Sequence, residues 1–65
     1  MTPELKEFIK NRDNYTCQLC GRYMPDGFGI EIDHIIPIAQ GGKSVRSNLQ
    51  VLCYACNRQK GSKLQ

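Results

Sequence analysis

Residues 30–36 read Ile-Glu-Ile-Asp-His-Ile-Ile, and this stretch decides how the rest of the chain is interpreted. It contains His34, the only histidine in the sequence, directly after the carboxylate of Asp33. The four cysteines form two Cys-x-x-Cys pairs, one on each side of this stretch: Cys17 with Cys20, and Cys53 with Cys56. This arrangement indicates a small domain that is held together on both sides of an Asp-His dipeptide.

The length of 65 residues allows one domain, residues 1–65. A chain this short buries too little apolar surface to offset its ordering entropy easily, so a metal ion or disulfides are expected to reinforce it. The first residues are charged, and no apolar stretch reaches the roughly 20 residues that a membrane span requires. We therefore expect a cytoplasmic protein without membrane association, in a reducing compartment where paired cysteines favour metal binding over disulfides.

Charge is distributed unevenly between the two halves of the chain. Residues 1–33 contain six acidic and four basic residues, whereas residues 34–65 contain five basic residues and no acidic one. The balances are −2 and +5, within a formal net charge of +3 that falls to about +1 if four thiolates bind one zinc ion. A half-chain with basic residues alone favours a phosphate-bearing partner, although such runs also occur as plain solvated surfaces.

Residues 3–12 are predicted to form an N-terminal helix. Thr2 suits the position before the first helical turn, and Pro3 suits the first position inside it. The apolar residues Leu5, Phe8 and Ile9 recur at helical spacing, so this face of the helix is expected to pack in the core.

A β-hairpin is expected over about residues 30–53, followed by a helix over about residues 54–62. Side chains alternate between the faces of a strand, which places Asp33 and His34 on opposite sides. The two side chains can share a site only at the end of the strand, where a bulge or twist redirects one of them. Tyr23 and Met24 are a further candidate strand, before the Pro-Asp-Gly turn at residues 25–27.

The two cysteine pairs predict a closed, structural zinc site with four thiolate ligands: Cys17, Cys20, Cys53 and Cys56. The 32 residues between the pairs exceed the roughly 15–20 of a simple zinc ribbon. The hairpin is therefore interpreted as an insertion between two zinc knuckles, at residues 17–20 and 53–56. Two disulfides, or reduced thiols without a metal, are the alternatives.

A second group of residues carries polar chemistry: Asp33, His34, Asn48 and Asn57. A neutral imidazole is suited to general-base catalysis near neutral pH, and carboxylate and amide oxygens are suited to Mg²⁺. Each residue also has a structural interpretation. His34 can be a half-buried strand residue, Asn48 a turn residue, and Asn57 a residue on the helix surface.

The order and spacing of these residues resemble the HNH endonuclease family, the ββα-metal or His-Me finger nucleases. The resemblance covers about residues 15–61, with Asp-His-Ile-Ile-Pro at 33–37, Gly-Gly at 41–42, Asn-Leu-Gln at 48–50 and Leu-Cys-x-x-Cys-Asn-x-x-Lys-Gly at 52–61. It implies a small, zinc-stapled α+β fold. This fold is a treble-clef-like ββα-metal finger with an N-terminal helix, a hairpin and a C-terminal helix.

The resemblance also implies roles for individual residues. His34 is the general base, Asp33 binds a catalytic Mg²⁺ or Mn²⁺, and Asn48 braces the loop that orients His34. Asn57 stands where many members have a final histidine, and is similar to the amide metal ligand of the endonuclease VII type of junction resolvase. Oxygen in place of imidazole favours Mg²⁺ or Mn²⁺ over softer ions. The basic residues expected at the DNA backbone are Lys60, Arg58, Lys43 and Arg46.

The activity that the resemblance implies is metal-dependent nicking of DNA, which leaves 5′-phosphate and 3′-hydroxyl ends. One such site cuts one strand, so double-strand cleavage would need two copies. The candidate partners besides DNA are a second copy in a homodimer, or an additional DNA-binding domain or partner. The alternative is a treble-clef zinc module that binds nucleic acid or protein without cutting.

Overall fold

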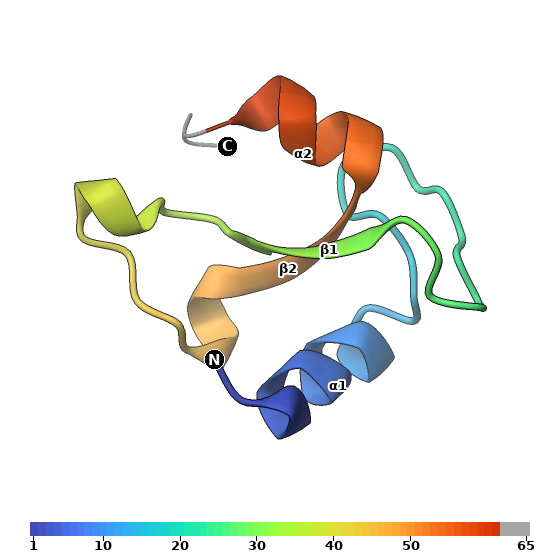
Figure 1. Ribbon diagram of the computed structural model, residues 1–65, viewed down its shortest axis with the longest axis horizontal. Helices are drawn as coiled ribbons and strands as arrows, with labels where there is room; N and C mark the ends of the chain where they lie inside the picture. Colours follow the sequence, from blue (N-terminus) through green and yellow to red (C-terminus); the bar gives the residue numbers. More distant parts are fainter. Residues whose placement is uncertain (62–65) are drawn as a thin grey trace.

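The computed structural model describes residues 1–61, in which two helices lie on opposite sides of a two-stranded antiparallel hairpin (Figure 1). The elements are helix α1 (Pro3–Arg12), strand β1 (Ile30–His34), strand β2 (Leu49–Cys53) and helix α2 (Tyr54–Lys60). Two short 3-10 turns, Ile38–Gln40 and Arg46–Asn48, lie in the connection between the strands. The predicted small α+β fold is confirmed. None of the helices described is long and apolar enough to cross a membrane.

Helix α1 covers the residues that the sequence predicts as helical. The backbone N–H of Leu5 donates to Oγ1 of Thr2 over 3.1 Å, which satisfies one of the amides left free at a helix start. Ile9 is fully buried and Leu5 packs against the core. The expectation that Phe8 joins them is wrong, because the residue is 41% exposed and its ring lies under the guanidinium of Arg46 instead.

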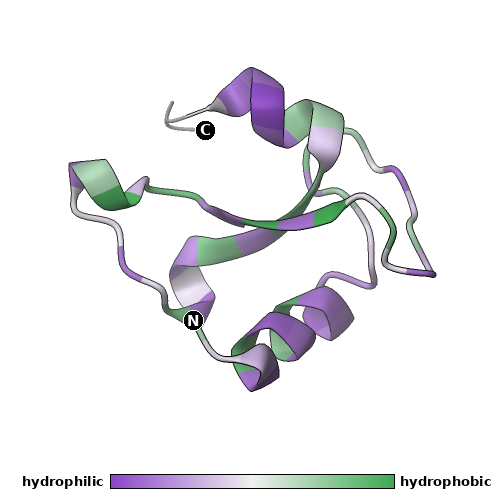
Figure 2. Ribbon diagram, viewed as in Figure 1, coloured by the Kyte–Doolittle hydropathy of each residue, from purple (hydrophilic) through white to green (hydrophobic). Residues whose placement is uncertain are grey.

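Strand β2 forms the centre of the core, since all five of its residues are buried. The two helices cover it from opposite sides, and β1 flanks it within the sheet (Figure 1). The buried apolar residues are Ile9, Cys17, Met24, Leu49, Val51, Leu52 and Cys53. Figure 2 shows the resulting contrast between the hydrophobic stretches of the strands and the hydrophilic C-terminal part of α2.

The hairpin register gives the strands two distinct ends. Ile30 pairs with Cys53 at one end, and His34 pairs with Leu49 at the other. Asp33 consequently lies opposite Gln50. The first end carries the cysteines, and the second end opens into the connection between the strands.

One expectation about the secondary structure is wrong, and another extends beyond the described residues. Tyr23 makes a single bridge with Thr16, so no strand is present there among the described residues. Met24 is nonetheless buried. Helix α2 ends at Lys60, because Gly61 adopts a φ of +55° that stops the helix. Residue 62, the expected end, lies outside the described residues.

Candidate metal centre and active site

The four cysteine sulfurs form one cluster at the first end of the hairpin. They lie within 4.8 Å of one another, and the sulfurs of Cys20 and Cys53 are 3.7 Å apart. A tetrahedral zinc ion with Zn–S bonds of about 2.3 Å has S···S edges of about 3.8 Å, so this cluster fits zinc. None of the four thiols is in a disulfide, which requires sulfurs about 2.05 Å apart. The structure thus supports the zinc interpretation over the disulfide alternative.

Backbone hydrogen bonds shape the first zinc knuckle. The N–H of Cys20 donates to the sulfur of Cys17 over 3.4 Å, and the N–H of Gly21 donates to the Cys17 carbonyl over 2.9 Å. Gly21 has a φ of +81°, which permits this tight turn. In the second knuckle, Cys53 ends β2 and Cys56 lies in the first turn of α2.

The thiols of the cluster differ in acidity. Burial acts to raise the pKa of Cys17, but hydrogen bonds, led by those from the backbones of Cys20, Cys53 and Leu19, outweigh it and lower the pKa to about 6. Hydrogen bonding with Cys53 and burial raise the pKa of Cys56 to about 12. The thiol of Cys17 therefore loses its proton readily, whereas a divalent cation would have to displace the proton of Cys56 on binding.

Asp33 lies at the opposite end of the hairpin, buried against β2 and α2. Its Oδ2 accepts a hydrogen bond from Nε2 of Gln50 over 2.9 Å. Nζ of Lys60 lies 3.3 Å from each carboxylate oxygen and donates to the His34 carbonyl over 3.1 Å. The side chains of Asp33 and Lys60 are only 6% and 5% exposed, so this ion pair is almost fully removed from water.

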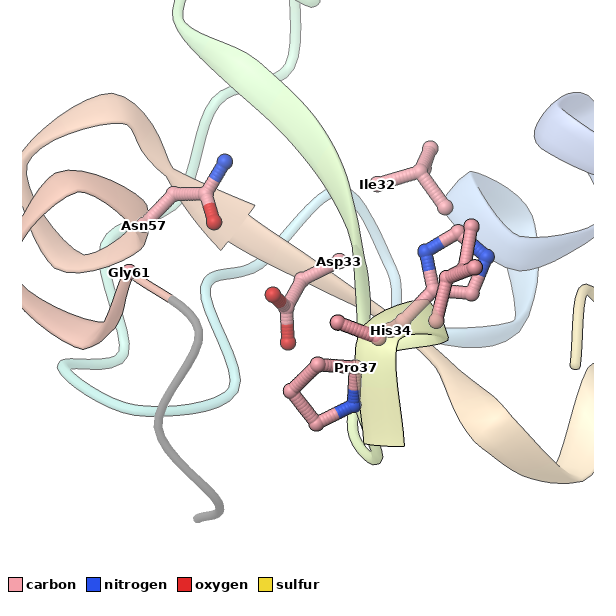
Figure 3. Close-up of a pocket in the computed structure, with 8 residues that line it drawn as sticks. Ile32, Asp33, His34, Pro37, Asn57 and Gly61 are labelled. Atoms are coloured by element: carbon pink, nitrogen blue, oxygen red, sulfur yellow. The ribbon is translucent and has the colours of Figure 1, made fainter. Parts of the chain in front are cut away.

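Asn57 presents an oxygen on the same side of β1 as Asp33. Its Nδ2 donates to Oε1 of Glu31, which leaves the amide oxygen directed toward the Asp33 carboxylate (Figure 3). Asp33, His34 and Asn57 line one open depression of about 350 Å³, together with residues 37–39 of the connection.

The His34 ring lies on the other side of β1 from the Asp33 carboxylate (Figure 3). Strand alternation thus continues to the last residue of β1, and no bulge brings the two side chains together. Nε2 of His34 lies 2.8 Å from Oγ of Ser44, a hydrogen-bond distance. In the tautomer where Nε2–H donates to Ser44, Nδ1 keeps its lone pair and can accept a proton.

Asn48 holds the connection between the strands closed. Its Oδ1 accepts from the N–H of Ile36 over 2.8 Å, while its Nδ2 donates to the carbonyls of Ile36 and Lys43 over 3.0 and 2.9 Å. Gly42 packs against this brace, and a Cβ there would lie 1.7 Å from the Ile36 carbonyl oxygen. The side chain therefore braces the loop that carries Ser44, the partner of His34.

The basic residues expected at DNA lie in different surroundings. Lys43, Arg46 and Arg58 are exposed. The guanidinium of Arg46 stacks over Phe8 at 4.5 Å, and that of Arg58 lies over Tyr54 at 5.3 Å. Lys60 differs from these three, because its ammonium is buried and is bound to Asp33 and to the backbone carbonyl of His34.

Sequence reasoning did not single out three side chains that hold the site: Gln50, Glu31 and Ser44. The sequence does mark Gln50, because it is the one polar residue in the apolar run Leu49–Cys53. Pairing Ile30 with Cys53 would have placed it opposite Asp33. No local pattern marks Ser44 or Glu31.

A thiol cluster, a hairpin that ends in Asp-His and a following helix that carries Asn57 define a zinc-stapled ββα-metal finger. A profile of the family described as HNH endonuclease matches residues 17–63. The chain belongs to the HNH endonuclease family. It is also 32% identical over 62 residues to the type IV methyl-directed restriction enzyme EcoKMcrA of Escherichia coli strain K12. That match covers 88% of this chain and 22% of the restriction enzyme, so the chain spans about a fifth of its relative.

Proposed function

We propose that this chain is a metal-dependent DNA endonuclease that nicks one strand and leaves 5′-phosphate and 3′-hydroxyl ends. The observation that carries the proposal is the placement of Asp33, Asn57 and His34 around one open depression. Membership of the HNH endonuclease family supports it. The chain matches about a fifth of its relative, so double-strand cleavage and sequence choice are assigned to a second copy or to a further DNA-binding domain or partner.

Asp33 and Asn57 are the proposed ligands of Mg²⁺ or Mn²⁺. Both present oxygen donors on the same side of β1, and hard divalent cations prefer such donors while retaining several waters. The ion, when bound, stabilises the negative charge that develops on the scissile phosphate and on the departing 3′ oxygen. The side-chain amide of Asn57 is oriented for this role because its N–H group donates to Glu31.

His34 is the proposed general base, with Nδ1 accepting a proton from the attacking water. In-line displacement places the attacking water and the departing oxygen on opposite sides of phosphorus. A base on one side of β1 and oxygen ligands on the other therefore match a phosphate that lies across the end of the strand. Ser44 holds the ring through Nε2, and Asn48 holds the loop that carries Ser44.

Three exposed basic residues are proposed to contact the flanking DNA backbone: Lys43, Arg46 and Arg58. Arg46 and Arg58 rest on aromatic rings, which restricts their side chains and reduces the entropy lost on binding a phosphate. Contacts of this kind orient a duplex and carry no sequence information. We do not propose this role for Lys60, because its ammonium is buried in the ion pair with Asp33.

The test is nicking of supercoiled plasmid by zinc-loaded protein with Mg²⁺ or Mn²⁺, beside an EDTA control. We expect His34→Ala to lower the rate by about 10²- to 10⁴-fold, the usual contribution of a general base. Gln59→Ala changes an exposed residue of α2 and should nick like the wild type. If the folded, zinc-loaded wild type nicks with neither ion, the protein is instead a treble-clef module that binds without cutting.

A further inference from the structure

Asp33 is the one buried residue within β1, and its carboxylate is held from the interior of the protein. Gln50 supports it from β2, directly opposite in the hairpin register, through the 2.9 Å bond from Nε2 to Oδ2. Lys60 supports it from α2. Asp33 and Gln50 are 7% and 4% exposed, so water does not compete for their hydrogen bond.

Gln50 is a polar residue in an otherwise apolar, buried strand, so its side chain needs hydrogen-bond partners in the interior. Its neighbours in β2 are Leu49, Val51 and Leu52, all at most 1% exposed. A buried amide in such a strand loses its hydration and destabilises the fold unless it forms hydrogen bonds in the interior. One of these bonds goes to the carboxylate of Asp33, which connects Gln50 to the candidate active site.

We propose that Gln50 is a positioning residue that fixes the Asp33 carboxylate for the binding of a divalent cation. This inference rests on the proposed function, in which Asp33 is a metal ligand. A carboxylate offers about four acceptor positions. Gln50 and Lys60 use positions on the interior side, while Asp33 also lines the open depression that it shares with Asn57.

A substitution at Gln50 tests the orientation of the Asp33 carboxylate separately from the local charge. A substitution at Lys60 changes both. Removing Lys60 would change both the direction of the carboxylate and the electrostatic repulsion of a divalent cation. Removing the amide of Gln50 changes no formal charge. Hydrogen-bond partners of metal ligands typically contribute about 10- to 100-fold to metal affinity or activity.

The experiment is a Mn²⁺ titration of zinc-loaded protein, with free Mn²⁺ measured by electron paramagnetic resonance. Gln50→Met removes the donor at similar volume, and Gln59→Met makes the same change at an exposed position of α2. We expect Gln50→Met to weaken Mn²⁺ binding at least about tenfold and Gln59→Met to leave it unchanged. The Mn²⁺ concentration for half-maximal nicking should rise in parallel, with a smaller loss of rate at saturating Mn²⁺.

Zinc content and circular dichroism establish that each variant is folded. If Gln50→Met does not fold, Gln50→Asn keeps a buried amide but shortens its reach by one methylene, and the same weakening is expected. Wild-type affinity for Mn²⁺ in a folded Gln50 variant would overturn the inference. The inference would also be overturned if Asp33→Asn bound Mn²⁺ as tightly as the wild type, because Asp33 would then not be a ligand. The same holds if the wild type bound no Mn²⁺ at all. A wild type that binds Mn²⁺ through Asp33 but does not nick contradicts the proposed function alone, and the titration still decides the role of Gln50.

Discussion

Different kinds of interaction stabilise the two ends of the hairpin. At the end where Ile30 pairs with Cys53, four cysteine sulfurs lie close together, an arrangement that suits a tetrahedral zinc ion. At the end where His34 pairs with Leu49, the polar groups come from both strands, from the connection and from α2, and hydrogen bonds hold them. The cysteine end is expected to depend on one set of metal bonds, whereas the other end depends on several separate contacts. The ends should therefore respond differently to perturbation.

Removal of zinc should have the largest effect. Structural zinc sites contribute on the order of 10 kcal/mol to the folding of small domains, which exceeds what a core of this size supplies. We expect a strong chelator, or Cys53→Ser, to abolish the cooperative fold at both ends of the hairpin. Circular dichroism and proton NMR measure the loss, and added zinc should reverse the effect of the chelator. A zinc-free chain with native spectra would show that the cysteine end does not control the fold.

Lys60→Met tests the opposite end. The substitution leaves the buried Asp33 carboxylate without its ion-pair partner, and breaking a buried pair from one side costs about 3 to 5 kcal/mol. We expect a loss of this size in denaturant unfolding of the zinc-loaded protein. Lys43→Met, in the exposed part of the connection, is the control and should change stability little. Equal stability of the two variants would mean that the ion pair does not hold this end.

Asn48→Ala tests the brace of the connection. It removes three hydrogen bonds to the backbone at a position that is 8% exposed. We expect a loss of about 2 to 3 kcal/mol of unfolding free energy, because the Ile36 amide is left without its partner. Asn11→Ala, which removes one exposed bond within α1, should cost much less. A wild-type melting temperature for Asn48→Ala would contradict the bracing role.

The same contrast explains what the sequence could predict. Helix α1 and the cysteine cluster follow from local signals, namely the Thr2 cap, the apolar spacing and the Cys-x-x-Cys motifs. The surroundings of Asp33 depend on residues 17 and 27 positions further along the chain, Gln50 and Lys60. Lys60 resembles any basic residue near a helix end, and only the packing of α2 on β1 shows that its ammonium is buried. Phe8 was misplaced for a similar reason, since its partner Arg46 lies in a distant loop.

Ser44→Ala is the smallest and most selective test of the second end of the hairpin. The Ser44 hydroxyl is exposed and makes a single bond to Nε2 of His34, so its loss should leave the unfolding free energy within about 0.5 kcal/mol of wild type. One neutral hydrogen bond contributes about 0.5 to 1.5 kcal/mol, which corresponds to about a twofold to tenfold fall in nicking rate if the ring is free to turn. Ser47→Ala, an exposed serine of the same connection, is the matched control. Equal rates for the two variants would mean that the backbone of β1 alone orients His34. A lower rate in Ser44→Ala would show that the connection, closed by Asn48, sets the direction of the base.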